Sequence, residues 1–278
     1  MTNEITITKE LQQQINTKKS VLESRLKING IDRTFEDYAN DIMYAVSKEP
    51  KLQSCTASSI VDSAFQLAKC GLSIGGNIGW LVPFSTSCQF QIGYEGYSLL
   101  LNRIAGIKHK IYECVYEDDT FEYIPTKKGV AENGDFYAKA SFSMNAGKEH
   151  KKIIGAYAFI SLKDGNSFIK YMNLDEISKY KPKSSSGMFW GTWDNIMYSK
   201  QVYKILAREL LKFYCNTNQN VSQDIIDVVA EDENREIKNV APIEAKAIIN
   251  SSDFETEAED ENRAAEEPKK GEAVDNLL

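Results

Sequence analysis

The chain has few of the residues on which covalent catalysis depends. It contains only two histidines among 278 residues, His109 and His150, and neither has a carboxylate or a cysteine at metal-ligand spacing. It has no HExxH motif, no Ser-His-Asp order and no paired Walker signature. We therefore expect a protein that is not an enzyme and that needs no cofactor.

Two motifs resemble ligand sites without meeting their requirements. Gly75–Gly79 is rich in glycine like a phosphate loop, but no Lys-Ser/Thr follows and the next segment is an apolar strand, which favours a glycine turn. The acidic run Glu117–Asp119 could hold a divalent metal, which leaves a metal-dependent enzyme open as an alternative. An acidic turn between two strands is the other interpretation of that run.

Cysteines and long apolar runs are also scarce. The five cysteines are odd in number and lack paired metal-type spacing, which indicates reduced thiols in a cytosolic protein. No N-terminal segment is apolar enough for a signal peptide, and no run approaches the length of a membrane span. We therefore expect a cytoplasmic protein without a membrane partner.

The charge is distributed unevenly along the chain. The net charge is −7, but residues 231–278 hold 15 acidic and 6 basic residues, a balance of −9, so the other 230 residues carry +2. Within these, residues 139–212 hold 13 basic and 6 acidic residues. The chain is thus a weakly basic body with an acidic tail, and only the body favours contact with nucleic acid.

The most informative stretch is residues 79–106. An apolar run, Trp80–Phe84, is followed by a polar turn and by Cys88–Ile92, in which apolar residues alternate with glutamines. This pattern predicts a β-hairpin with one solvated face, and Pro83 places its strand at an edge or at a bulge. The chain then bends into an apolar helix, Tyr97–Ile104, which Gly106 ends.

The remaining segments suggest helices, then strands, then a long helix. Residues 1–20 are expected to be flexible, and three helices are predicted within 21–72, with Thr34 as an N-cap. From residue 216 onward (216–278), a polar linker, a short apolar helical piece near Ile225–Ala230 and an acidic, largely disordered tail are expected. The expected strands and the long helix cover residues 108–116, 121–124, 136–144, 153–162, 167–172 and about 192–213.

The long helix carries a row of cations beside its apolar stripe. Lys200, Lys204, Arg208 and Lys212 recur every four residues and therefore lie along one flank. Cations about 6 Å apart suit successive backbone phosphates, and we expect at least two of the four to contact DNA. The alternative is a solvated flank, because long lysines commonly cover apolar edges.

Three long motifs resemble one known family. The first is LVPF at Leu81–Phe84, followed after a short polar gap by CQFQIGYEGYSLLLNR at Cys88–Arg103. The second is PKLQSCTASSIVDSAFQLAKCGL at Pro50–Leu72, and the third is GTWDNIMYSKQVYKILARELLKF at Gly191–Phe213. With the LKDG turn at Leu162–Gly165, they resemble the RecT family of phage-type single-strand DNA annealing proteins over residues 25–215. The family pattern has Leu-Pro at the end of the last helix, where this chain has Phe213-Tyr214-Cys215.

The resemblance implies an ATP-independent protein that coats single-stranded DNA and anneals it in phage or prophage recombination. The implied fold is α+β, a curved antiparallel β-sheet against helices, with core 21–215 and helices 21–72 for protomer contacts. Implied partners are single-stranded DNA, the annealed duplex, further copies in a ring or filament, a phage exonuclease and a host single-stranded-DNA-binding protein. A metal-dependent DNA-processing enzyme and a phage structural protein without DNA binding are the alternatives.

A single-strand binder combines a basic groove with aromatic rings on which bases stack. Tyr94 is the more exposed aromatic candidate, whereas Trp193 is expected to anchor the long helix in the core. The full set of candidate DNA-binding residues is Gln89, Gln91, Tyr94, Tyr97, Arg103, Lys108, Lys110, Lys181, Lys183, Trp190, Lys200, Lys204, Arg208 and Lys212.

Overall fold

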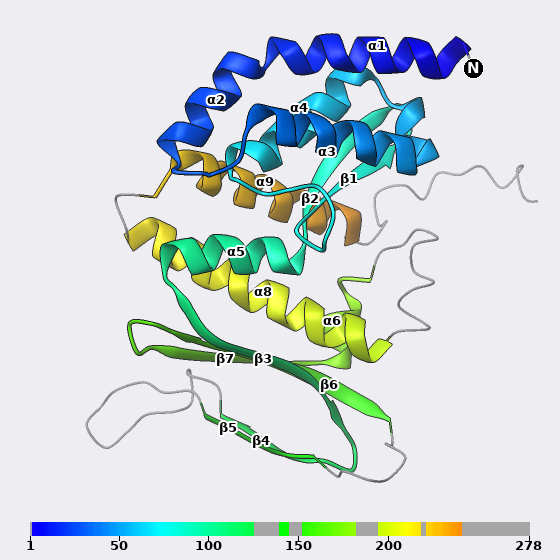
Figure 1. The fold of residues 1–278 in the computed structure, drawn as a ribbon. Helices are drawn as coiled ribbons and strands as arrows, with labels where there is room; N and C mark the ends of the chain where they lie inside the picture. The colour runs from blue at the N-terminus through cyan, green and yellow to red at the C-terminus, as the bar shows by residue number, and fades with distance from the viewer. Residues whose placement is uncertain (1, 125–138, 145–151, 182–193, 218–220, 241–278) are drawn as a thin grey trace, which may run out of the picture. The chain divides into compact units, whose positions relative to one another are not determined.

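The computed structural model describes residues 2–124, 139–144, 152–181, 194–217 and 221–240, all within the unit Met1–Val240 (Figure 1). Among the predicted elements, the first part of strand 136–144, the start of the long helix at 192 and the acidic tail beyond 240 fall outside these residues. No helix among the described residues is long and apolar enough to cross a membrane.

The N-terminal part consists of helices that pack on one another. The prediction of a flexible segment 1–20 is wrong for most of its length, because residues 2–17 form a helix in which Leu11 and Ile15 are fully buried. Their four-residue spacing places both side chains on one face, towards the helix that follows Thr56. The helices are α1 Thr2–Thr17, α2 Lys19–Ile28, α3 Phe35–Lys48, the short 3₁₀ helix η1 Pro50–Ser54 and α4 Ala57–Lys69.

The predicted caps explain where α3 and α4 begin. The Thr34 hydroxyl accepts the Asp37 N–H at 3.2 Å, and the Asp37 carboxylate accepts the Thr34 N–H at 2.8 Å, which completes a capping box. The Thr56 hydroxyl accepts the Ser59 N–H at 3.3 Å at the start of α4. The predicted N-cap at Thr34 is therefore confirmed.

The central hairpin is present as predicted, with one solvated face. Strand β1 (Gly79–Phe84) pairs antiparallel with β2 (Ser87–Ile92) in a two-stranded sheet, in which Pro83 needs no second ladder. Helix α5 (Tyr94–Ile104) begins three residues earlier than predicted. Position 96 of this helix requires glycine, because a Cβ there would lie 2.2 Å from the carbonyl oxygen of Ile78.

Antiparallel strands follow α5, which confirms the predicted α+β class. Strands β3 (Ile107–Tyr116), β6 (Ile153–Leu162) and β7 (Ser167–Asn173) form a sheet in the order β3-β6-β7, and β4 (Thr120–Ile124) pairs with β5 (Lys139–Ser143). The short helix α6 (Leu174–Ser178) follows β7, and helix α8 (Asp194–Thr217) packs across β3, β6 and β7 (Figure 1).

Each side of the three-stranded sheet is covered differently. Small and branched residues of β6, among them Ala156, Ala158 and Ile160, are fully buried on the side that faces α8. On the opposite side, the Phe121 ring of β4 lies 5.8 Å from the Tyr157 ring and 4.8 Å from the Tyr171 ring, measured between centroids. Aromatic contacts therefore hold the β4–β5 ribbon against the sheet.

Residues 223–240 form a packed helix, α9 (Gln223–Val240). It contains the helical piece predicted near Ile225–Ala230, and Ile225, Val228 and Val229 are buried in the same core as α5, α8 and β6. The helix continues to residue 240, although the sequence predicts a disordered tail from residue 231. That prediction fails here because Asp232, Glu233 and Glu236 face cations of α8 and are not part of a solvated charge run.

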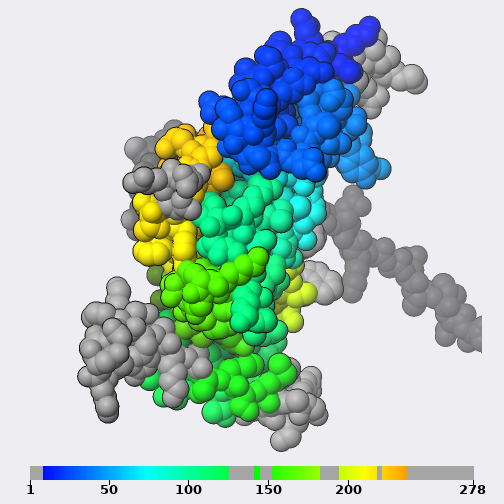
Figure 2. Space-filling view, turned by 60° about the vertical axis from the view of Figure 1, so that its left-hand side comes forward, coloured from blue at the N-terminus to red at the C-terminus, as the bar shows by residue number. Residues whose placement is uncertain are grey.

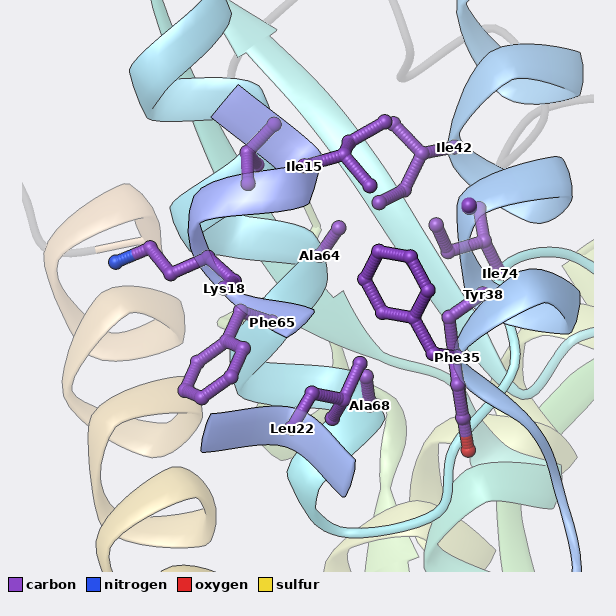
Figure 3. Close-up of a pocket in the computed structure, with 12 residues that line it drawn as sticks. Ile15, Lys18, Leu22, Phe35, Tyr38, Ile42, Ala64, Phe65, Ala68 and Ile74 are labelled. Atoms are coloured by element: carbon purple, nitrogen blue, oxygen red, sulfur yellow. The ribbon is translucent and has the colours of Figure 1, made fainter. Parts of the chain in front are cut away.

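A small cavity lies among α1, α3 and α4 (Figure 3). Its volume is about 20 Å³, and its lining is almost entirely apolar, including Ile15, Phe35, Ile42 and Ala64. A space of this size holds one water at most and offers that water no set of polar partners. We therefore regard it as a packing gap in the N-terminal helices.

Candidate nucleic-acid interface

The outer face of the β1–β2 hairpin presents aromatic and amide side chains. Trp80 pairs with Gln91 and Val82 with Gln89 across the ladder, so these four side chains share one face with Phe84. Trp80 is 44% exposed and Phe84 is 40% exposed. We call these five residues the hairpin face.

The inner side of the hairpin is fixed to neighbouring helices. The Cys88 N–H donates to the Ser59 hydroxyl at 3.0 Å, and the Ser63 hydroxyl donates to the Cys88 carbonyl at 2.9 Å. The guanidinium of Arg235 on α9 lies 4.3 Å from the centroid of the buried Phe90 ring. The backbone beneath the hairpin face is therefore held in place by these contacts, so that ligand binding need not order it.

Sequence reasoning placed Gln89 and Gln91 on this solvated face but did not select Trp80 or Phe84. Considered alone, the apolar run that contains them predicts a strand buried in the core. The signal that could have identified them is the pairing itself, because residues opposite the outward glutamines must also point outward.

Three tyrosines and two lysines gather where α5, β3 and α8 meet; we call Tyr94, Tyr112, Tyr203, Lys110 and Lys200 the tyrosine–lysine cluster. The ring centroids lie 6.1 Å apart for Tyr94–Tyr112, 6.4 Å for Tyr94–Tyr203 and 4.9 Å for Tyr112–Tyr203. Lys200 Nζ lies 4.8 Å from the Tyr94 centroid, and Lys110 Nζ lies 5.4 Å from the Tyr203 centroid. Cations over aromatic faces hold the cluster together. Figure 2 shows a face on which α5 (teal) lies beside α8 (yellow).

Two tyrosines of the cluster, Tyr112 and Tyr203, remain protonated at neutral pH. Burial raises the pKa of each to about 12. The Tyr203 hydroxyl also forms a hydrogen bond with the Ser98 hydroxyl. These two tyrosines therefore contribute neutral rings and hydroxyls, and the positive charge of the cluster comes from its lysines.

The cation row of α8 is largely occupied by carboxylates of α9. Lys204 is 6% exposed and Arg208 is 4% exposed. Lys204 Nζ lies 3.3 Å from Glu236 and 3.7 Å from Asp232, and Arg208 forms an ion pair with Glu236. Phosphates could reach these two cations only if α9 moved away, so in this arrangement both belong to the protein interior.

The ends of the row differ from its middle. Lys212 pairs with Glu233, but its side chain is nearly half exposed. Lys200 has no ion-pair partner among the residues that the structure describes, and it lies partly exposed above Tyr94. Lys200 is therefore the member of the row best placed to meet a phosphate.

Electrostatics keep the buried network charged. Burial alone raises the pKa of the Glu236 carboxyl, but Lys204 and Arg208 outweigh it, and the net pKa is lowered. For Arg208 the signs are reversed: burial lowers its pKa, but Glu236, Tyr97 and Glu233 raise it by more, and the net pKa is raised. The partners thus stabilise the ionised forms of both groups in the interior.

Asp232 of α9 joins the hairpin to α5. Its carboxylate accepts the Ile92 N–H at 2.8 Å and the Tyr97 hydroxyl at 2.8 Å. Tyr97 is fully buried, and burial together with the nearby Asp232 raises its pKa well above the usual value. The Tyr97 ring is therefore not accessible to a base in this structure and acts as a packing residue.

Arg103 donates hydrogen bonds to the backbone at the end of a neighbouring helix. Its guanidinium donates to the Cys70 carbonyl at 2.6 Å and to the Gly71 carbonyl at 2.9 Å, which satisfies the C-terminal end of α4. Among the other predicted residues, Lys108 is exposed on β3, and Lys181 Nζ lies 5.0 Å from the Tyr198 centroid. Lys183, Trp190 and Trp193 lie outside the described residues.

The acidic run 117–119 forms a turn between β3 and β4. The Asp119 carboxylate accepts the Tyr116 N–H at 2.9 Å, and the Glu117 N–H donates to the Lys152 carbonyl at 3.0 Å. Within the part of the chain that the structure describes, no three His, Cys, Asp or Glu residues gather as metal ligands would.

Comparison with known proteins agrees with the resemblance seen in the sequence. The chain is 27% identical over 249 residues to YqaK of Bacillus subtilis (strain 168), an uncharacterized protein, and the alignment covers 84% of this chain and 82% of that protein. A sequence profile of the RecT family matches residues 36–244, a range that includes the hairpin, the tyrosine–lysine cluster and α9. The match covers well over half of the chain, and the chain therefore belongs to the RecT family.

Proposed function

We propose that this protein anneals complementary DNA strands without ATP, holding single-stranded DNA on the hairpin face and the tyrosine–lysine cluster. Family membership supports DNA recombination by single-strand annealing as the general role. The observation that carries the proposal is the combination of exposed Trp80 and Phe84 with the partly exposed Lys110 and Lys200. Rings and cations on fixed elements are what a sequence-tolerant single-strand binder needs.

Annealing requires no bond-making site. The lysines would neutralise backbone phosphates, and the rings would stack on some bases while the Watson–Crick edges stay free to pair. A single body with so few available cations binds weakly. Copies assembled as a ring or filament along one strand would supply the necessary avidity.

Other partners follow from the same proposal. The annealed duplex is the product, and a phage exonuclease together with a host single-stranded-DNA-binding protein would supply or cover the substrate strand in the bacterial cytoplasm. Residues 241–278 contain 11 acidic and 4 basic residues. We propose that they either compete with DNA for the cations or recruit a partner.

The test of the function is an annealing assay with the purified full-length chain. Two complementary oligonucleotides, one with a fluorophore and one with a quencher, are mixed with enough protein to coat them, without nucleotide and with EDTA. We expect faster quenching than with DNA alone. No acceleration would exclude the annealing function. Cleavage of the labelled strand in a parallel reaction with magnesium in place of EDTA would favour the nuclease alternative.

The hairpin face gives a residue-level prediction. Replacing Trp80 by alanine should weaken binding to single-stranded DNA by about 1–3 kcal/mol if a base stacks there. Its effect on the melting temperature should be small, because the ring is 44% exposed. Binding is measured by fluorescence anisotropy with an oligothymidylate.

Tyr44→Ala on α3 is the matched control, because that ring is 66% exposed and lies outside both proposed surfaces. It should leave affinity unchanged. Equal losses of affinity in the two variants would show that the hairpin face is no specific stacking site.

A further inference from the structure

Lys110 forms an ion pair with a carboxylate of the same chain, that of Glu95. Its ammonium lies 2.8 Å from Oε1 and 2.7 Å from Oε2 of Glu95, and 3.2 Å from the Ser98 hydroxyl. Both carboxylate oxygens therefore face one ammonium, much as two non-bridging oxygens of a phosphate would. Glu95 and Ser98 both belong to α5, whereas Lys110 belongs to β3.

The Lys110–Glu95 pair is accessible, unlike the pairs between α8 and α9. The side chains of Lys110 and Glu95 are 31% and 32% exposed, whereas those of Lys204 and Glu236 are 8% and 10% exposed. A partly solvated ion pair contributes little stability and can exchange its anion, whereas a buried pair is lost only at a large cost.

The pair also determines how much charge the cluster offers to DNA. Lys110 and Lys200 lie over two tyrosines that contact each other, and Glu95 cancels the charge of Lys110. With Glu95 in place, one cation of the cluster is available. A phosphate that displaces Glu95 would meet two.

We propose that Glu95 is a built-in competitor of the DNA phosphate for Lys110 and thereby limits the affinity of the tyrosine–lysine cluster for single-stranded DNA. This inference rests on the proposed function. A limit of this kind suits an annealing protein, because the strand must leave the surface when the duplex is complete.

The experiment compares the full-length wild type with Glu95→Gln, Lys110→Met and the double variant, by anisotropy of an oligothymidylate over a series of NaCl concentrations. Glu95→Gln should bind about two- to fivefold more tightly, the range that a partly exposed ion pair spans. Its log–log salt dependence should steepen by about 0.7, which is one more phosphate contact. In the Lys110→Met background, Glu95→Gln should have no effect.

Glu113→Gln is the control, because Glu113 is exposed on the same strand but its side chain alternates to the opposite side of the sheet from Lys110. A gain in Glu113→Gln equal to that of Glu95→Gln, or a gain by Glu95→Gln that persists without Lys110, would reduce the effect to general repulsion and overturn the proposal. Weaker binding by Glu95→Gln at an unchanged melting temperature would also overturn it, since Glu95 would then position Lys110. A wild type that binds no oligothymidylate would instead refute the proposed function.

Discussion

A chain that ends at Ala230 is expected to lose a large part of its folding stability, whereas a chain that ends at Val240 should melt like the full-length protein. The shorter chain lacks Asp232 and Glu236, so Lys204 and Arg208 lose the carboxylates with which they pair in the interior. Removing one partner of a buried ion pair costs about 3–5 kcal/mol. A domain of this kind has about 5–15 kcal/mol in total, so this loss is a substantial share of its stability.

Thermal melting followed by far-UV circular dichroism, together with urea titration, measures both truncations. The comparison separates the second half of α9 from the residues beyond it, because the two truncated chains differ only in 231–240. If the chain ending at Ala230 keeps the full melting temperature, the carboxylates of α9 are dispensable, and the ion pairs contribute no net stability.

Two cations of the same row on α8 are expected to behave in opposite ways. Arg208→Met should lower the free energy of unfolding by about 3–5 kcal/mol, because it breaks a buried pair with Glu236. Lys200→Met should change it by less than about 0.5 kcal/mol, because Lys200 lies partly exposed over Tyr94. Lys200→Met should instead weaken binding of every single strand alike and flatten the log–log salt dependence by about 0.7.

Urea unfolding and salt-dependent anisotropy of the same two variants provide both readouts. The double variant Arg208→Met/Glu236→Gln should regain part of the stability, since no charge of that pair is then left unpaired. A normal stability of Arg208→Met combined with a flatter salt dependence would return Arg208 to the DNA-binding surface and show that α9 moves aside.

The sequence predicted local structure well wherever the signal itself was local. Alternation in Cys88–Ile92 predicted β2 and its solvated face, and Thr34 marked the start of α3 through its own capping box. Gly106 has a φ of +72° after α5, the conformation that favours glycine at the end of a helix. The long motifs also placed the chain in its family, as the matched range 36–244 confirms.

The roles of charged residues depended on contacts that no local pattern contains. A helix flank with cations every four residues looks the same whether water, DNA or another helix faces it, and only the fold brings Glu236 within reach of Arg208, 28 residues earlier. Similarly, Tyr97 and Tyr94 are both candidate DNA-binding residues in the sequence. In the fold, Tyr97 is fully buried and donates its hydroxyl hydrogen to Asp232, while Tyr94 stays partly exposed beneath Lys200.

The sequence by itself therefore determined the secondary structure around the hairpin, the family and the absence of a recognisable catalytic motif, because these depend on residue type and spacing along the chain. Only the tertiary structure decided which lysines remain available, that residues 223–240 belong to the folded body, and that Trp80 is exposed. The physical reason is that burial and ion pairing are properties of residue pairs distant in sequence, and their energies are large enough to override what a local charge or apolar run suggests.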